Sequence, residues 1–208
     1  MANTTFSGAV RSKGGFTSIS ENSSTGAIST LSSISSTGVS SFDANTLATE
    51  AGTGITGGTG TIYRSSVQRV GGIITTRILI DLTGLRSTAS GDIIGVNGTS
   101  NVCHIGQITA AQNGTILTGS MECFEAPTGG DPDINVHSAT EGTGVEDGAI
   151  SSLTETLLVN AGDATLGSKV YFTAVPAADE FLYLMLGDTT DADYTAGKLF
   201  IELMGYAA

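Results

Sequence analysis

The sequence predicts an all-β fold: an antiparallel β-sandwich or jelly-roll-like domain preceded by an extended N-terminal arm. Glycine accounts for 29 of the 208 residues, about twice its usual share of ~7%. Charged residues make up only 13% of the chain, so the good helix formers Lys and Glu are scarce. Short apolar stretches alternate with Gly, Asn and Asp turn signals, a pattern typical of sandwiches, jelly rolls and barrels.

Residues 1–60 are predicted to form the arm. They contain five charged residues, and single apolar residues stand among Ser, Thr and Gly. Neither the helical period of 3.6 nor the strand period of 2 persists. Such a segment buries too little apolar area to fold alone. We therefore expect it to dock on its own domain or on a neighbouring subunit; a floppy tail is the alternative.

Residues 61–208 are predicted to form the β-domain, which begins with a hairpin. Gly71-Gly72 separates the strand candidates Thr61–Val70 and Ile73–Leu82, and two such residues between strands indicate a tight turn. One face of the second strand is expected to carry Ile78, Ile80 and Leu82. The further strand candidates are Asp92–Val96, Asn101–Thr109, Thr115–Phe124, Ile134–His137, Lys169–Ala174, Glu180–Leu186 and Lys198–Met204.

A second hairpin is predicted at Asn113-Gly114, because both residues tolerate the positive φ of a type I′ turn. The strand Asn101–Thr109 would then pair with Thr115–Phe124. In that register Cys103 and Cys123 point to opposite faces of the sheet and cannot form a disulfide.

One helix is expected. Asp147–Asn160 carries Ile150, Leu153, Leu157 and Leu158 at helical spacing.

The net charge of −12 is unevenly distributed along the chain. Residues 1–86 hold six basic and four acidic residues, whereas residues 87–208 hold two basic and sixteen acidic ones. This asymmetry favours a molecule whose one end meets an acidic partner while the other faces water. The alternative is that the acidic residues only maintain solubility. Nucleic acid is not expected as a partner, because phosphate binding needs a basic footprint.

No membrane or secretory segment is expected. No apolar run approaches the ~18 residues that a membrane span requires. The N-terminus lacks the basic and apolar regions of a signal peptide.

No pattern predicts catalysis or cofactor binding. Gly52-Thr-Gly54-Ile-Thr-Gly57 matches GxGxxG but lacks the flanking strand and helix of a dinucleotide site. We interpret it instead as a flexible elbow between the arm and the domain. His104 and His137 are the only imidazoles, and His104 is expected to be a packing residue. We therefore expect no catalytic residue, no cofactor and no enzymatic activity.

Two acidic clusters have a composition that could hold Ca²⁺. Neither has the spacing of an EF-hand loop, and Asp is also the usual solvated turn residue. Paired carboxylates of a polysaccharide hydrolase are a further alternative, although the chain has no Trp to form a sugar platform. The clusters consist of Asp131 with Asp133, and of Asp188, Asp191 and Asp193.

Several motifs resemble those of a family of virion structural proteins from tailed phages of marine bacteria and cyanobacteria. The resemblance runs from the arm to the C-terminus. The motifs are MANTTFSGAVRS at residues 1–12, GDIIG at 91–95, PTGGDPDI at 127–134, ATEGTG at 139–144 and TAGKLFIELMGY at 195–206. The resemblance implies a head decoration or cement protein on the virion's capsid surface, made in the cytoplasm of the bacterial host. It implies a homotrimer and the major capsid protein as partner, and it supplies no catalytic residue.

The arm is the segment expected to grip the capsid lattice. Its aromatic side chains could bury apolar area against a neighbour, and its basic start would steer encounter with an acidic surface. A host-attachment or glycan-binding module on a head or tail fibre is the alternative function. The residues expected to contact the capsid or another subunit are Phe6, Arg11, Lys13, Phe16 and Phe42.

Overall fold

The computed structural model describes residues 16–21, 28–34, 40–41 and 46–207. The chain divides into two compact units, Met1–Ala44 and Asn45–Ala208. The sequence placed the boundary between the arm and the domain after residue 60.

Unit 1 contains a small antiparallel sheet in the order β1-β2-β3. Its strands are β1 (Phe16–Glu21), β2 (Ile28–Ile34) and β3 (Ser40–Ser41). Phe16 lies opposite Ile34, so the first strand pairs with the second over its whole length. The described strands of this segment therefore satisfy part of their backbone hydrogen bonding among themselves.

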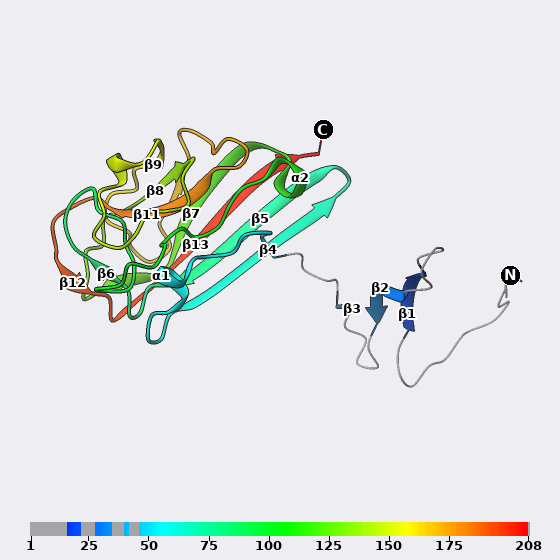
Figure 1. Cartoon of the computed structure of the whole chain (residues 1–208), viewed down its shortest axis with the longest axis horizontal. Helices are drawn as coiled ribbons and strands as arrows, with labels where there is room; N and C mark the ends of the chain where they lie inside the picture. The colour runs from blue at the N-terminus through cyan, green and yellow to red at the C-terminus, as the bar shows by residue number, and fades with distance from the viewer. Residues whose placement is uncertain (1–15, 22–27, 35–39, 42–45, 208) are drawn as a thin grey trace, which may run out of the picture. The chain divides into compact units, whose positions relative to one another are not determined.

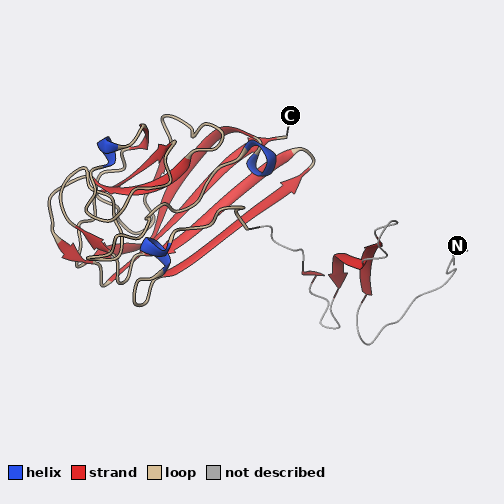
Figure 2. Ribbon diagram, viewed as in Figure 1, coloured by secondary structure: helices blue, strands red, loops and turns tan. Residues whose placement is uncertain are grey.

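Unit 2 is mostly β and contains two main antiparallel sheets, which confirms the predicted fold class (Figure 2). The five-stranded sheet has the order β10-β7-β13-β5-β4, the three-stranded sheet has the order β11-β8-β9, and β12 pairs with β6. The strands are β4 (Ile62–Val70), β5 (Ile73–Asp81), β6 (Arg86–Ser87), β7 (Thr115–Thr128), β8 (Ile134–Ala139), β9 (Glu155–Val159), β10 (Lys169–Tyr171), β11 (Phe181–Leu186), β12 (Ala192–Asp193) and β13 (Ala196–Tyr206). The helical turns are α1 (Thr53–Thr56), α2 (Ala110–Asn113) and a 3₁₀ turn at Ile150–Ser152.

The large sheet is organised around β13, which pairs with β5 on one side and with β7 on the other (Figure 1). Burial alternates along the strand: Leu199, Ile201 and Leu203 are buried, and the residues between them are partly or fully exposed. The hairpin predicted at Gly71-Gly72 is confirmed, with Val70 opposite Ile73.

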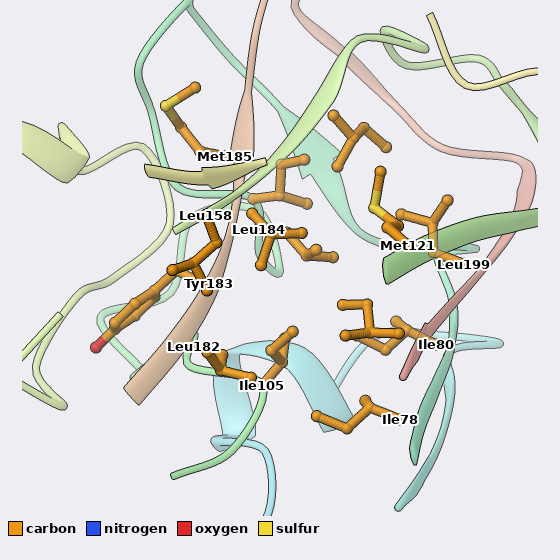
Figure 3. Close-up of a cluster of buried hydrophobic side chains, with 14 of the residues drawn as sticks. Ile78, Ile80, Ile105, Met121, Leu158, Leu182, Tyr183, Leu184, Met185 and Leu199 are labelled. Carbon is orange, nitrogen blue, oxygen red and sulfur yellow. The ribbon is translucent and has the colours of Figure 1, made fainter. Parts of the chain in front are cut away.

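The hydrophobic core lies on the inner face of the large sheet (Figure 3). Ile78 and Ile80 of β5 are fully buried, as the alternation of that strand predicted. Leu182 and Leu184 of β11, in the small sheet, belong to the same cluster. The two sheets thus share one core, as the layers of a sandwich do.

The small sheet extends beyond its three strands at the β11 edge. Ile94 donates to Leu184 and Ile105 donates to Leu182, both through backbone N–H groups. The segments predicted as strands at Asp92–Val96 and Asn101–Thr109 therefore make isolated bridges and single hydrogen bonds rather than regular strands. Their backbone groups cover the β11 edge, which would otherwise be open.

The hairpin predicted at Asn113-Gly114 is wrong. Asn113 ends α2 and is fully buried, where its Nδ2 donates to Thr76 Oγ1 (2.8 Å) and its Oδ1 accepts from the Thr109 N–H (2.9 Å). Gly114 does adopt positive φ (69°). A Cβ there would lie 2.1 Å from the carbonyl oxygen of Tyr206. After this turn β7 therefore pairs with β13 and not with the segment that precedes the turn.

The helix predicted at Asp147–Asn160 is also wrong. Only Ile150–Ser152 is helical, and β9 follows. Within β9 Leu158 is fully buried, whereas its neighbour Leu157 is 39% exposed. A short apolar run does not distinguish a strand from a helix by its period, and pairing with β8 selects the strand.

The glycine-rich stretch predicted as an elbow is instead a helical turn of unit 2, in which Gly52, Gly54 and Ile55 are buried. The N–H groups of Gly52 and Gly54 donate to the carbonyls of His104 and Val102, both at 2.9 Å. A Cβ on Gly54 would lie 2.4 Å from Cys103 Sγ. The glycines therefore permit close packing here.

We expect Ile201→Ala to lower the free energy of unfolding by about 2–5 kcal/mol, because it leaves a cavity in the core. Ile201 is 1% exposed and lies opposite both Ile78 and Met121. Urea titration would measure the change. Met204→Ala on the same strand is the control: Met204 is 41% exposed, so its loss should be below about 1 kcal/mol. Equal losses would contradict the assignment of the two faces.

Candidate functional site

The predicted capsid-contact residues belong to unit 1. Phe16 is the first residue of β1. Phe6, Arg11, Lys13 and Phe42 lie outside the described residues. Their predicted role stays a prediction.

Asp131, from the first acidic cluster, is buried and acts as a hydrogen-bond acceptor for the backbone. It accepts from the N–H of Asp133 (2.9 Å) and from the N–H of Thr190 (3.0 Å). Burial alone would raise the pKa of Asp131, but these bonds and one from the Thr190 side chain outweigh it and lower the pKa. The carboxylate thereby ties the turn after β7 to the loop after β11.

Asp133 lies beside Asp131 but experiences the opposite effect. Burial, followed by the charges of Asp131, Asp163 and Asp188, raises its pKa. Its Oδ1 is buried and has no hydrogen-bond partner among the described residues. Two carboxylates separated by one residue are therefore held in different environments.

The second acidic cluster binds an arginine. Arg86 pairs with Asp191 (2.8 Å) and Asp193 (2.9 Å). These pairs tie β6 to the segment around β12, whose strands are only two residues long. Among the residues that the structure describes, no three His, Cys, Asp or Glu side chains are grouped so that they could hold a metal ion.

The two histidines lie at opposite edges of β11. His104 is buried against the rings of Phe181 (5.0 Å) and Tyr183 (6.5 Å), and burial lowers its pKa. His137, opposite Tyr183 on β8, contacts Glu155 through Nδ1 at 2.7 Å. His104 is therefore a buried packing residue, as the sequence indicated, but it lies outside the regular strands and its Nδ1 has no hydrogen-bond partner among the described residues.

Both cysteines are buried and free. The absence of a disulfide between them is what the sequence predicted. The reason differs from the expected one, because Cys103 does not lie in a strand paired with that of Cys123. Burial raises the pKa of Cys103 to about 12 and also raises the pKa of Cys123. Neither thiol is thus prepared to act as a nucleophile.

The surface that sequence reasoning missed is the outer face of the large sheet, the side turned away from the core. Large apolar side chains are exposed on it. Phe124 is 47% exposed and stacks on Phe200, with ring centroids 5.0 Å apart and 10° between the planes. The other exposed apolar residues on this face are Ile62, Val70, Ile73, Tyr171, Met204 and Tyr206.

The small sheet is more completely covered than the large one, and of its three strands only β9 contains exposed residues. All six residues of β8 are buried. The loop after β8 covers the side of the sheet that carries Tyr183, a fully buried member of the core cluster. The Tyr183 hydroxyl donates to the Glu141 carbonyl (2.7 Å) and accepts from the Gly144 N–H (3.2 Å). The two sheets therefore differ in how completely their faces are covered.

Most charged side chains on the outer face pair with one another. Arg77 contacts Glu202 at 2.8 Å, across the β5–β13 pairing. Lys198 of β13 lies between Asp81 of β5 (3.3 Å) and Glu125 of β7. On the β10 side of the sheet, Lys169 faces Glu122 (3.4 Å).

With Arg64, which donates to the Tyr63 carbonyl (2.8 Å), these pairs balance the charge of the outer face within a strongly acidic unit. Residues 46–207 contain six basic and eighteen acidic residues. The outer face holds four basic ones, Arg64, Arg77, Lys169 and Lys198, and four acidic ones, Asp81, Glu122, Glu125 and Glu202. The net charge of −12 therefore comes entirely from the rest of the unit.

Comparison with protein-family models, with curated proteins and with solved structures finds no match to this chain. Among the described residues no helix is long and apolar enough to cross a membrane.

We expect Asp131→Asn to lower the free energy of unfolding at neutral pH by about 1–3 kcal/mol, because charge-assisted hydrogen bonds are lost. The pKa of Asp131 is lower in the folded protein. Its stabilisation is therefore present above about pH 4 and is lost as the pH falls through the folded-state pKa. Urea titrations at several pH values should show the difference from wild type shrinking below about pH 4.

Asp133→Asn is the matched control for this substitution. The pKa of Asp133 is raised by folding, so its stabilising effect is present below the unfolded-state pKa and lost as the pH rises through the folded-state pKa. At neutral pH the variant should be as stable as wild type or more stable. Equal destabilisation by both substitutions would contradict the two assigned environments.

Proposed function

We propose that this chain is a structural virion protein, a capsid decoration or cement protein that binds the outer surface of a tailed-phage head as a homotrimer and stabilises its lattice. The division of the chain into a small N-terminal unit and a larger β-unit carries the proposal. A rigid β-unit with a separate N-terminal segment suits a protein that holds neighbouring subunits together. The sequence resemblance to virion structural proteins of tailed phages points to the same role.

The features of the β-unit fit such a role. Its acidic clusters are used in internal hydrogen bonds and ion pairs, as at Asp131 and Arg86. Its surface outside the outer face carries the entire net charge of the unit. Like charge keeps crowded copies soluble, which a protein present in many copies on one particle requires.

The N-terminal segment is proposed to grip the major capsid protein. Burial of aromatic side chains such as Phe6, Phe16 and Phe42 against a neighbour would contribute on the order of 1.5–3 kcal/mol each before ordering costs. Arg11 and Lys13 would speed encounter with an acidic capsid surface, an attraction that salt screens.

Deletion of residues 1–20 tests this proposal. We expect the truncated protein to keep its oligomeric state but to lose binding to heads that lack the protein, measured by co-sedimentation. Binding that is unchanged at every salt concentration would contradict the arm mechanism. Gold labelling that places the protein on tails or fibres, together with specific binding on a glycan array, would favour host attachment instead.

A single substitution distinguishes long-range electrostatic attraction from packing in the proposed contact between the arm and the head. Arg11→Gln should weaken head binding at low salt, and the difference from wild type should fall as salt rises. Arg69→Gln removes the same charge from the exposed end of β4 and serves as the matched control. An equal effect of both substitutions would show that only the total charge matters.

A further inference from the structure

We propose that the outer face of the large sheet is a self-association surface, on which a second copy of this chain docks through the same face. The proposal is independent of head binding. It names a contact between copies that is distinct from the arm.

The distribution of charge indicates which kind of partner fits the outer face. Outside the outer face, residues 46–207 carry fourteen acidic and two basic residues, whereas the face carries four of each. A basic partner would be attracted to the acidic remainder rather than to this face, and a nucleic acid would find no basic footprint for its phosphates. The face fits a surface that exposes apolar side chains and carries no net charge, and the same face of another copy has both properties.

Most charged side chains on the face are in ion pairs, which makes the face suitable for burial between copies; Arg64, which donates to the Tyr63 carbonyl (2.8 Å), lies on the edge strand β4. An unpaired charge is costly to remove from water. Here Arg77 already contacts Glu202 (2.8 Å), and Lys198 contacts Asp81 (3.3 Å). Docking would therefore bury the stacked rings of Phe124 and Phe200 without isolating these charges.

The size of the sheet is adequate for a specific dimer. The eleven residues of β13 span about 34 Å at ~3.4 Å per residue, and the four long strands, ~4.8 Å apart, are about 14 Å wide, since β10 has only three residues. The product is on the order of 500 Å² per copy, or about 1,000 Å² in total, which just reaches the size expected of a specific interface. A face that pairs with itself does so across a two-fold axis.

A two-fold contact joins two copies of any assembly that the other contacts form. The full-length protein is therefore expected to contain an even number of copies: two, or six if the proposed threefold contact also forms. Multi-angle light scattering over a range of protein concentrations would measure the mass. Because each copy has a net charge of −12, raising the salt concentration should strengthen the association by screening repulsion.

Met204→Glu and Phe124→Glu place an unpaired charge at two different points of the face. We expect each to halve the mass of the assembly at a fixed concentration, with an unchanged circular dichroism spectrum. Met204 lies between Thr75 and Thr118, so the new carboxylate has no acidic neighbour in register. Leu157→Glu, at an exposed position of the small sheet, is the matched control and should leave the mass unchanged.

The outcomes separate this inference from the proposed function. A trimer whose mass neither face variant changes would overturn the face-to-face contact and leave the proposed function standing. A wild-type monomer would overturn both the face-to-face contact and the proposed homotrimer. A dimer that both face variants convert to monomers would support the contact and count against the trimer. A loss of mass in Leu157→Glu equal to that in the face variants would also overturn the inference.

Discussion

The pairing of β13 with both β5 and β7 is the constraint on which the rest of unit 2 depends. This last strand of the chain lies in the middle of the large sheet, between strands from the beginning and the middle of the unit. Its alternation places Leu199, Ile201 and Leu203 in the core and the intervening residues on the outer face. The sheet is therefore complete only when the C-terminal segment is in place, and one register determines both the core and the outer face.

The same pairing explains why the uneven distribution of charge along the sequence is not preserved in the folded unit. The sequence has a positive first part and an acidic second part, which suggested that one end meets an acidic partner. In the sheet, Arg77 of the first part pairs with Glu202 of the second, and Arg86 pairs with Asp191 and Asp193. Antiparallel pairing of distant strands thus neutralises much of the asymmetry. What remains is a difference between a neutral sheet face and an acidic remainder, which no count along the chain reveals.

Local sequence signals predicted the elements whose structure is decided locally. The Gly71-Gly72 turn and the alternation of β5 were found because a two-residue turn and a period of 2 are short-range patterns. Asn113-Gly114 was misread because the Asn113 side chain is used to cap a helical turn and to reach Thr76. Leu157 and Leu158 were misread because β8, which is distant in sequence, selects their conformation. The outer face could not be predicted, since it depends on which five strands lie side by side.

The neutral regions of the chain are where contacts with other molecules would cost least. Arg11 and Lys13 balance the two acidic residues of Met1–Ala44, so unit 1 has no net formal charge, and the outer face has none either. The acidic remainder of unit 2 repels its counterpart on every other copy, and desolvating its carboxylates in a contact would be costly. Crowded copies of such a chain would therefore associate only through its neutral surfaces. Repulsion over most of the surface thus becomes a source of specificity, because it leaves few arrangements in which two copies can touch.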